Sequence, residues 1–437
     1  MANSFFTTSS GDGECLIWVD KSIRHFDIPD GVKVIGDAFK GCTSLTSIDI
    51  PNSVTFIDTE AFYGCTSLTD IKIPDSVTKI GESAFKGCTS LTSIDIPDNV
   101  TEIGGRAFEG CTSLTSIDIP NSVTRIGWSA FEGCTSLTSI DIPDSVTEIR
   151  EGAFNNTKWL DDQPNGIYVN NILYAVKGGE EVHFDIREGT ISINERAFEG
   201  CTSLTSIDIP NSVTSIGVGA FYGCTSLTSI DIPNSVTKID DGAFLGCTSL
   251  TSIDIPKSVT EIGEYAFLGC TSLTSIDIPN SVTKIGEHAF SRCTSLTSID
   301  IPDSVTEIGE GAFKGCTSLD SIDIPDSVRI IRENAFTGCS LASISVDAIN
   351  PIYFSEDNVL YEKRENGDNA LILYLPTKNN SSFIIGDKTV RIEDFAFKDA
   401  DNLEEIFLPN SEHYLIIGGC AFEGCNSLKS IHSPVKI

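Results

Sequence analysis

The sequence predicts a repeat solenoid: a right-handed coil that adds one short strand per turn to a parallel β-sheet, with two β-hairpin-like insertions. The eleven residues GCTSLTSIDIP, which run from Gly41 to Pro51, recur along the chain. An Ala-Phe pair returns every 23 residues, in one run that ends at Phe154 and another that ends at Phe336. A period of about 20 to 29 residues is typical of solenoids with one strand per turn. The length of 437 residues also exceeds what a single compact core uses.

Each turn has the same internal order, for which residues 224–246, CTSLTSIDIPNSVTKIDDGAFLG, are an example. Ile230 and Ile232 alternate with polar residues, so they share the inward face of a short strand. Pro233 lacks a backbone donor and ends that strand. After the NSV corner, a second extended segment leads to Phe244, which we expect to fill the interior between neighbouring turns. A single turn of this kind cannot bury its apolar residues alone, so the turns must stack.

Two departures from the period divide the chain. The first contains PNGIYVNNILYAVKGG and the second contains NPIYFSEDNVLYEKRENGDNALILYLP. Both alternate apolar and polar residues around a turn, which predicts a β-hairpin that either carries binding or joins and caps the repeat blocks. The predicted parts are an N-terminal cap at 1–25, a first repeat block at 26–154, a hairpin insertion at 155–183, a second repeat block at 184–346, a hairpin insertion at 347–382, and divergent C-terminal repeats with a cap at 383–437.

Thirteen of the fifteen cysteines occupy one column of the repeat, from Cys42 to Cys339 with Cys425 in the last copy. This column points inward at the start of each strand, where a free thiol behaves as a small apolar residue. Zinc sites need clustered pairs such as C-x-x-C, and the sequence contains none. Stacked turns also permit disulfides geometrically, but inward thiols bonded to the backbone favour a structural role. Cys15 and Cys420 lie outside the column and are the thiols for which we expect reactivity.

The aspartate of SIDIP occupies one solvent-facing column in most of the turns. Stacking places these carboxylates about one strand spacing apart, where like charges repel by about 1 kcal/mol per pair even in water. One interpretation is a cation-binding row, with calcium as the candidate ion. The other is a solvated acidic face copied by duplication, because a tight calcium site needs about six to eight oxygens. The candidate metal-ligating residues are Asp208, Asp231, Asp254, Asp277, Asp300 and Asp323.

Variation between the turns is concentrated around the Ala-Phe pair. Several of the variable positions carry aromatic or imidazole rings, and exposed aromatic side chains are favoured at protein interfaces. The alternative interpretation is sequence drift at surface positions that tolerate substitution, which would produce the same pattern. The candidate partner-binding residues are Trp128, Tyr222, Tyr265 and His288.

Charge and motifs narrow the classes of function. The formal net charge of −33 argues against nucleic acid and anionic membranes, and it makes cations and basic proteins the natural partners. The sequence contains no apolar run of about 18 residues, so we expect no transmembrane helix. The start, MANSFFTTSS, lacks the pattern of a secretory signal peptide, so the default expectation is a cytoplasmic protein without membrane insertion. None of the common catalytic motifs accompanies the five scattered histidines, so we expect neither an enzyme nor a cofactor.

The repeat CTSLTSIDIPNSVTSIGVGAFYG and the insertion NPIYFSEDNVLYEKRENGDNALILYLP resemble the BspA-like leucine-rich repeats, a bacterial and protist class with a 23-residue period. The resemblance extends from about Phe26 to Ser430. It implies a leucine-rich repeat coil, no general catalytic residues, and a surface or extracellular protein linked to adhesion. The expected function is therefore non-enzymatic binding of a protein ligand of unknown identity, in adhesion or scaffolding. The alternative is a cation-organised structural or surface element that uses the aspartate row.

Overall fold

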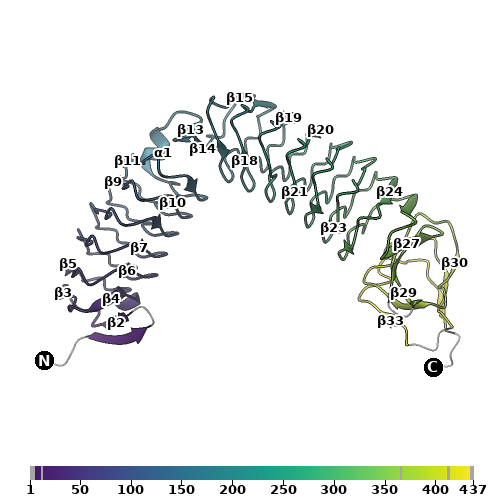
Figure 1. Ribbon diagram of the computed structural model, residues 1–437, viewed down its shortest axis with the longest axis horizontal. Coiled ribbons are helices and arrows are strands. Elements are labelled where there is room, and N and C mark those ends of the chain that lie inside the picture. The colour runs from purple at the N-terminus through teal and green to yellow at the C-terminus, as the bar shows by residue number, and fades with distance from the viewer. Residues whose placement is uncertain (1–4, 11–12, 365–366, 411–413, 434–437) are drawn as a thin grey trace. The chain divides into compact units, whose positions relative to one another are not determined.

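The computed structural model describes residues 5–10, 13–364, 367–410 and 414–433. The chain forms two compact units, Met1–Tyr174 and Ala175–Ile437. Within each unit, consecutive turns stack in chain order, as the colours in Figure 1 show. The predicted repeat solenoid is confirmed. Among the residues described, no helix is long and apolar enough to cross a bilayer.

Two ladders of strands run through the first unit. The longer ladder is an eight-stranded sheet, parallel except for its first pair. Its strands, in order, are β1 (Phe5–Ser10), β2 (Gly13–Val19), β4 (Val32–Ile35), β6 (Phe56–Ile57), β7 (Lys79–Ile80), β8 (Glu102–Ile103), β10 (Arg125–Ile126) and β12 (Glu148–Ile149). The shorter ladder pairs β3 (His25–Asp27) with β5 (Ser47–Asp49) and β9 (Ser116–Asp118) with β11 (Ser139–Asp141). A 3-10 helix, η1, spans Asp37–Phe39.

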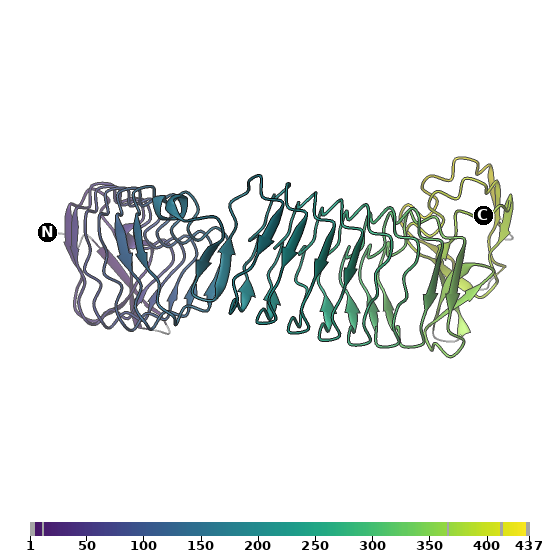
Figure 2. The same cartoon turned by 90° about the horizontal axis from the view of Figure 1, so that it is seen from above.

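The second unit repeats this plan, and in Figure 2 the strand arrows of its consecutive turns lie next to one another. One ladder pairs β15 (His183–Asp185) with β17 (Ser206–Asp208), β19 (Ser229–Asp231) with β20 (Ser252–Asp254), and β24 (Ser321–Ile324) with β26 (Ser343–Val346). The other pairs β16 (Ser192–Ile193) with β18 (Ser215–Ile216), and it continues as β21 (Glu261–Ile262), β22 (Lys284–Ile285), β23 (Glu307–Ile308) and β25 (Ile330–Ile331).

The C-terminal part of the second unit contains two further sheets. The larger consists of β27 (Tyr353–Glu356), β28 (Val359–Lys363), β29 (Asn369–Tyr374), β31 (Thr389–Ile392) and β33 (Ile416–Ile417). The smaller consists of β30 (Ser382–Ile384), β32 (Glu405–Phe407) and β34 (Ser430–His432).

The two ladders refine the expectation of one parallel sheet built from SIDI strands. In the first unit the second extended segment pairs continuously, because isoleucines such as Ile80 and Ile103 lie in register in adjacent turns. Each SIDI strand is short, and a proline such as Pro120, which has no N–H to donate, follows soon after the aspartate. The SIDI ladder therefore breaks into pairs and isolated bridges.

Phenylalanines of consecutive turns form the centre of the core. Phe85 and Phe108 are fully buried, with ring centroids 5.4 Å apart and nearly parallel planes. Phe221 and Phe244 repeat this arrangement at 5.3 Å in the second unit. Such rings bury a large apolar area and gain from offset stacking. Each turn is therefore stabilised mainly by its neighbours, as expected for a solenoid.

A glycine column sets the close approach of one turn to the next. A Cβ atom on Gly104 would lie 2.6 Å from the carbonyl carbon of Gly81, well inside van der Waals contact. Gly110 belongs to a second column and adopts a left-handed φ of +71°, which glycine reaches without a steric penalty. Replacing Gly104 by a larger residue would push adjacent turns apart.

The first insertion contains the predicted hairpin and a helix that the sequence did not predict. Helix α1 (Lys158–Asp162) begins after Thr157, whose side chain accepts a hydrogen bond from the Leu160 N–H. Strands β13 (Ile167–Val169) and β14 (Ile172–Ala175) follow as neighbours in a sheet. The Tyr174 hydroxyl accepts a 3.2 Å hydrogen bond from the N–H of Phe154. The insertion therefore covers the last phenylalanine of the first repeat block.

The second insertion has one strand more than the predicted hairpin. Strands β27, β28 and β29 form an antiparallel meander, since β28 pairs with both of the others. The Tyr353 hydroxyl accepts a 2.8 Å hydrogen bond from the N–H of Ile331. Both insertions thus use a tyrosine hydroxyl to satisfy a backbone donor of the preceding repeat block.

Candidate functional site

The aspartate row lies on the solvent face of the SIDI ladder, as the alternation of the strand residues predicted. Asp231 lies opposite Asp254 in the β19–β20 pair, and single bridges extend the row to Asp277 and Asp300. All six candidate aspartates are exposed: Asp208, Asp231, Asp254, Asp277, Asp300 and Asp323. Asp323 lies opposite Ser345, whose hydroxyl donates to its carboxylate, so the row of facing carboxylates ends there.

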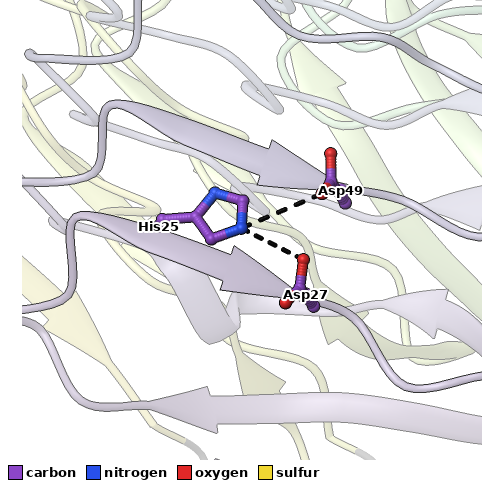
Figure 3. Close-up of side chains that lie close together, drawn as sticks. All are labelled: His25, Asp27 and Asp49. Carbon is purple, nitrogen blue, oxygen red and sulfur yellow. Dashed lines mark hydrogen bonds and ion pairs between the residues drawn. The ribbon is translucent and has the colours of Figure 1, made fainter.

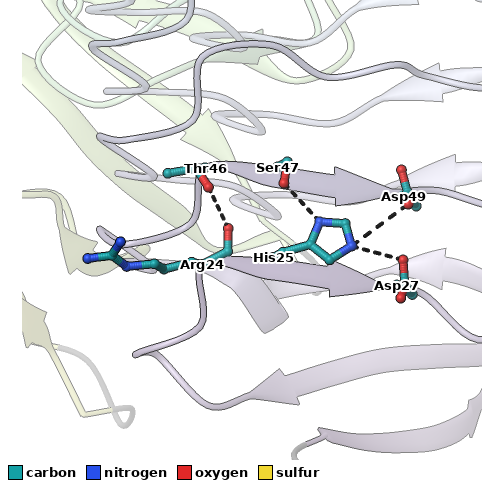
Figure 4. A network of polar contacts seen from close by, with 6 residues as sticks. All are labelled: Arg24, His25, Asp27, Thr46, Ser47 and Asp49. Atoms are coloured by element: carbon teal, nitrogen blue, oxygen red, sulfur yellow. Dashed lines mark hydrogen bonds and ion pairs between the residues drawn. The ribbon is translucent and has the colours of Figure 1, made fainter.

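A histidine joins the row at the first SIDI-type strand of the first unit. His25 lies on β3 beside Asp27 of the same strand and Asp49 of β5, with all three side chains on one face (Figure 3). The His25 Nε2 atom is 3.0 Å from Asp27 Oδ1 and 3.8 Å from Asp49 Oδ2. On the other side of the ring, Nδ1 is 2.8 Å from the Ser47 hydroxyl (Figure 4). The imidazole is therefore held between a hydroxyl and two carboxylates.

The second unit contains the same arrangement at its own first SIDI-type strand. His183 Nε2 is 3.0 Å from Asp185 Oδ1 and 3.7 Å from Asp208 Oδ2. His183 Nδ1 is 2.8 Å from the Ser206 hydroxyl. Strands β15 and β17 hold these residues in the same parallel register as β3 and β5. The geometry of the cluster is thus reproduced in two separate units.

Sequence reasoning treated these histidines as scattered surface residues and missed both clusters. The available signal was the triplet His-Phe-Asp, which replaces Ser-Ile-Asp at residues 25–27 and again at 183–185. Serine and histidine occupy the same strand position, so the exchange adds a nitrogen donor to the aspartate row. Within the described residues, these two clusters are the groups of three His, Cys, Asp or Glu side chains whose donor atoms all lie within 4.8 Å of one another.

The candidate partner-binding residues fall on the surface beside the phenylalanine stack. Trp128 is 38% exposed, and its ring lies 3.9 Å from the guanidinium carbon of Arg106 in the preceding turn. Tyr222 is 40% exposed. A Cβ atom added to Gly105 would lie 2.4 Å from the Trp128 ring, so the tryptophan packs directly against the backbone of the preceding turn.

Tyr265 and His288 form a second ring pair, in the second unit. Their centroids are 5.4 Å apart and their planes differ by 23°. Both residues have left-handed backbones, with φ of 58° and 51°, at a column where some turns carry glycine and others, such as Ser83 and Ser129, carry a different left-handed residue. The Tyr265 hydroxyl donates to Glu287 at 2.7 Å, and this hydrogen bond raises the pKa of Tyr265 to about 12. A left-handed backbone is less favourable for a non-glycine residue than for glycine, and this column accepts that cost in many turns.

The cysteine column points inward and binds the backbone, as predicted. Cys65 Sγ donates to the carbonyl oxygen of Phe39 at 3.2 Å, and Cys247 repeats this contact with Phe221 at 3.2 Å. Burial raises the pKa of the Cys247 thiol to about 12. Cys420 is exposed, whereas Cys15 is partly buried and its pKa is raised by burial and by nearby Asp58. The raised pKa disfavours the thiolate and hence the reactivity expected of Cys15.

A cleft of about 360 Å³ in the second unit lies beside β25, β29 and the turn after β31. Its lining includes Arg332, Glu362 and Glu393. Arg364 bridges the two glutamates, at 2.8 Å from Glu362 and 3.0 Å from Glu393. Burial raises the pKa of Glu362. Arg332 pairs instead with Glu307, at 3.1 Å. Nothing in the sequence pattern predicted this cleft.

Comparison with known proteins identifies the repeat class. The family model for the BspA type leucine rich repeat region matches six copies, over residues 17–126, 177–296, 237–359 and 374–437. Among curated proteins none matches this chain.

Several solved structures are similar to the chain. A leucine rich cell surface protein from Faecalibacterium prausnitzii is 34% identical, with 68% of this chain and 93% of that chain covered and a TM-score of 0.40. A leucine-rich repeat protein from Bacteroides ovatus is 27% identical, with coverage of 76% and 99% and a TM-score of 0.35. One from Eubacterium ventriosum is 24% identical, with coverage of 84% and 97% and a TM-score of 0.48. Since the family model matches more than half of the residues, the chain belongs to the BspA-type leucine-rich repeat family.

Proposed function

We propose that the chain is a non-enzymatic binding protein that takes a protein partner on the extended faces of its turns and acts in adhesion or scaffolding. Members of its family are typically protein-binding or surface proteins and are generally not enzymes. The relative from Faecalibacterium prausnitzii is described as a cell surface protein. A position at the cell surface or outside the cell is part of the proposal.

The observation that carries the proposal is the pair of rings at Tyr265 and His288. These side chains are half-buried, extend from left-handed backbone positions and lie against each other, so their rings are already held in place before a partner arrives. Trp128, held on Arg106, provides a comparable anchor in the first unit. Rigid aromatic side chains lose little conformational entropy on binding, which is why they are enriched among residues that contribute most to interfaces.

The charge of the chain favours a basic partner. The net charge is −33, and the exposed aspartates present carboxylates along the SIDI ladder. Such a field raises the association rate with basic proteins and makes that rate sensitive to salt. The aromatic anchors would then determine how long the complex lasts, because most affinity differences within one interface arise from dissociation.

The test is a solid-phase binding assay against a panel of purified matrix and serum proteins, including basic ones. We expect at least one panel member to bind, and Trp128→Ala or Tyr265→Gly to weaken that binding about tenfold or more. Neutralising Asp231 and Asp254 should mainly lower the association rate at low salt. Binding that is unchanged in both aromatic variants would rule out these rings as contacts, and a panel without any binder would count against adhesion.

The alternative is a cation-organised surface element built on the aspartate row. Carboxylates that lie opposite each other in adjacent turns support this alternative, because adjacent carboxylates attract counterions. They belong to Asp231, Asp254, Asp277 and Asp300. A melting curve with and without millimolar calcium, at fixed ionic strength, separates the two. A ligand that binds only the folded state must raise the midpoint, whereas a solvated acidic face responds equally to matched sodium.

A further inference from the structure

We propose that each histidine–aspartate cluster is a binding site for one divalent transition-metal ion of the zinc type. The first site consists of His25, Asp27 and Asp49, and the second of His183, Asp185 and Asp208. The inference does not depend on the proposed protein partner, because it concerns side chains that are already in place in the chain.

The donor atoms have spacings suited to a small cation. Zinc binds imidazole nitrogen and carboxylate oxygen at about 2.0–2.2 Å, so tetrahedral ligands around it lie about 3.4 Å apart. In the first cluster the His25 Nε2 atom lies 3.0 Å from Asp27 Oδ1 and 3.8 Å from Asp49 Oδ2. In the second cluster the corresponding distances are 3.0 and 3.7 Å. These nitrogen–oxygen spacings bracket the ideal value, and all three donor atoms of each cluster lie within 4.8 Å of one another, so an ion can enter once the exposed carboxylates turn toward it.

The serine hydroxyl on the far side of each ring allows the histidine to change tautomer without losing a hydrogen bond. Without a metal ion, a neutral ring with its proton on Nε2 donates to Asp27, because a carboxylate only accepts, and Nδ1 then accepts from the Ser47 hydroxyl. With a metal ion on Nε2, the proton resides on Nδ1 and is donated to Ser47, because a hydroxyl both donates and accepts. A partner of this kind fixes the ring orientation in metal sites. Ser206 occupies the same place beside His183.

The ligand set favours transition metals over calcium. Imidazole is a preferred ligand of zinc, nickel and copper, whereas calcium takes six to eight oxygens. Two carboxylates and one neutral histidine give a site charge of −2, which a divalent ion neutralises. The aspartates are 77–78% exposed, so water can complete the coordination shell. The site is thus open, and we expect weaker binding than at a closed structural zinc site.

Other turns that contribute to the aspartate row provide a comparison within the same chain. Ser229, Asp231 and Asp254 occupy the positions that correspond to the histidine and the two aspartates, in the same parallel register. They offer two carboxylates but no nitrogen. His432 provides a second comparison, since its Nε2 atom has one carboxylate partner within the described part of the chain, Glu405, at 3.5 Å, and its ring stacks on Phe407. If histidine plus two carboxylates is the requirement, these places should not bind the ion.

The experiment uses the full chain without an affinity tag, at pH 7.5 under reducing conditions, with Cys420→Ser to remove the exposed thiol. Calorimetric titration with Zn²⁺ should give two sites per chain. His25→Ser and His183→Ser should each remove one site, and the double variant should remove both. Serine stands at this position in other turns, so the variants should fold, and their circular dichroism and melting curves check this. Asp49→Asn and Asp208→Asn give the same losses with the histidines retained.

Two controls make the result specific. Asp231→Asn should leave both sites, and a large excess of Ca²⁺ should not displace zinc. With histidine ring carbons labelled, paramagnetic Ni²⁺ should broaden the signals of His25 and His183 first, and those of His288 and His432 only at higher concentrations. The proposal is overturned if the double histidine variant binds as much zinc as the parent chain, or if Asp231→Asn lowers the stoichiometry to the same extent as His183→Ser.

Discussion

The Sγ atom of Cys111 donates a 3.2 Å hydrogen bond to the carbonyl oxygen of Phe85, 26 residues earlier in the chain. The same carbonyl accepts the N–H of Cys88 within its own turn. One oxygen atom thus joins the local turn to the next turn of the stack. Repetition of this contact along each unit explains why cysteine occupies this column.

Removing this thiol should destabilise the first unit. Cys111 is fully buried, so Cys111→Ala loses both the hydrogen bond and the packing of the sulfur atom. We expect a loss of about 1–2 kcal/mol in unfolding free energy, and a smaller loss for Cys111→Ser, whose hydroxyl still donates. Urea unfolding measures both. Cys420→Ser, at an exposed position, is the control and should stay within about 0.5 kcal/mol of the parent chain. Equal effects of Cys111→Ala and Cys420→Ser would contradict a structural role for the column.

Alkaline pH should destabilise the fold through the same column. Burial raises the pKa of Cys42 and Cys201 to about 11, and that of Cys293 to about 12, from an ordinary value of 9.0. The unfolded chain therefore releases these protons first. Stability is fully present below about pH 9 and is lost as the pH rises toward 11–12.

Urea midpoints between pH 8 and 11, with thiolate absorbance followed in the folded state, provide the measurement. The folded chain should show little thiolate from the column at pH 9. Full ionisation of all fifteen thiols at that pH in the folded state would refute the prediction.

Neutralising part of the aspartate row should stabilise the second unit at low salt. Asp231 and Asp254 face each other in adjacent strands, where their repulsion amounts to about 1 kcal/mol. The double variant Asp231→Asn, Asp254→Asn should therefore raise the melting midpoint at low salt, and the gain should disappear in 1 M NaCl because salt screens exposed charges. Asp98→Asn is the matched control, since other turns carry asparagine at that position. A gain that persists in high salt would point to a cause other than repulsion.

Replacing His288 by glycine should separate stability from binding. His288 is left-handed at φ 51°, and Gly242 and Gly311 occupy the same column with φ of 60° and 55°. Relief of backbone strain should offset the lost ring contact, so the unfolding free energy of His288→Gly should stay within about 1 kcal/mol of the parent. Partner binding should nevertheless weaken with the loss of the ring pair. Ser83→Gly, at the same column of the first unit, is the control for binding. A His288→Gly chain that binds normally would exclude the ring pair from the interface.

The two histidine–aspartate clusters illustrate why part of the candidate site escaped prediction. The alternation of strand residues placed His25 and Asp27 on one exposed face, because side chains two apart on a strand point the same way. The proximity of Asp49 depends on how β3 pairs with β5, and this pairing spans 22 residues instead of the 23 of the regular turns. In the second cluster β15 and β17 pair at the regular spacing of 23 residues, so spacing alone does not explain the miss. What the sequence does not reveal is that each imidazole turns toward both carboxylates, because that depends on side-chain contacts between turns.

The sequence by itself determined the period, the inward columns of isoleucine, phenylalanine and cysteine, and the exposed aspartate row. These features follow from local alternation and from the identity of the turns, since identical units must stack in the same way. The tertiary structure alone decided that the second extended segment forms a ladder of its own, that Tyr265 and His288 stack on left-handed backbones, and that each HFD histidine meets two carboxylates. The physical reason is that these relationships depend on hydrogen bonds and ring contacts between turns, whose register the 23-residue period limits but does not fix.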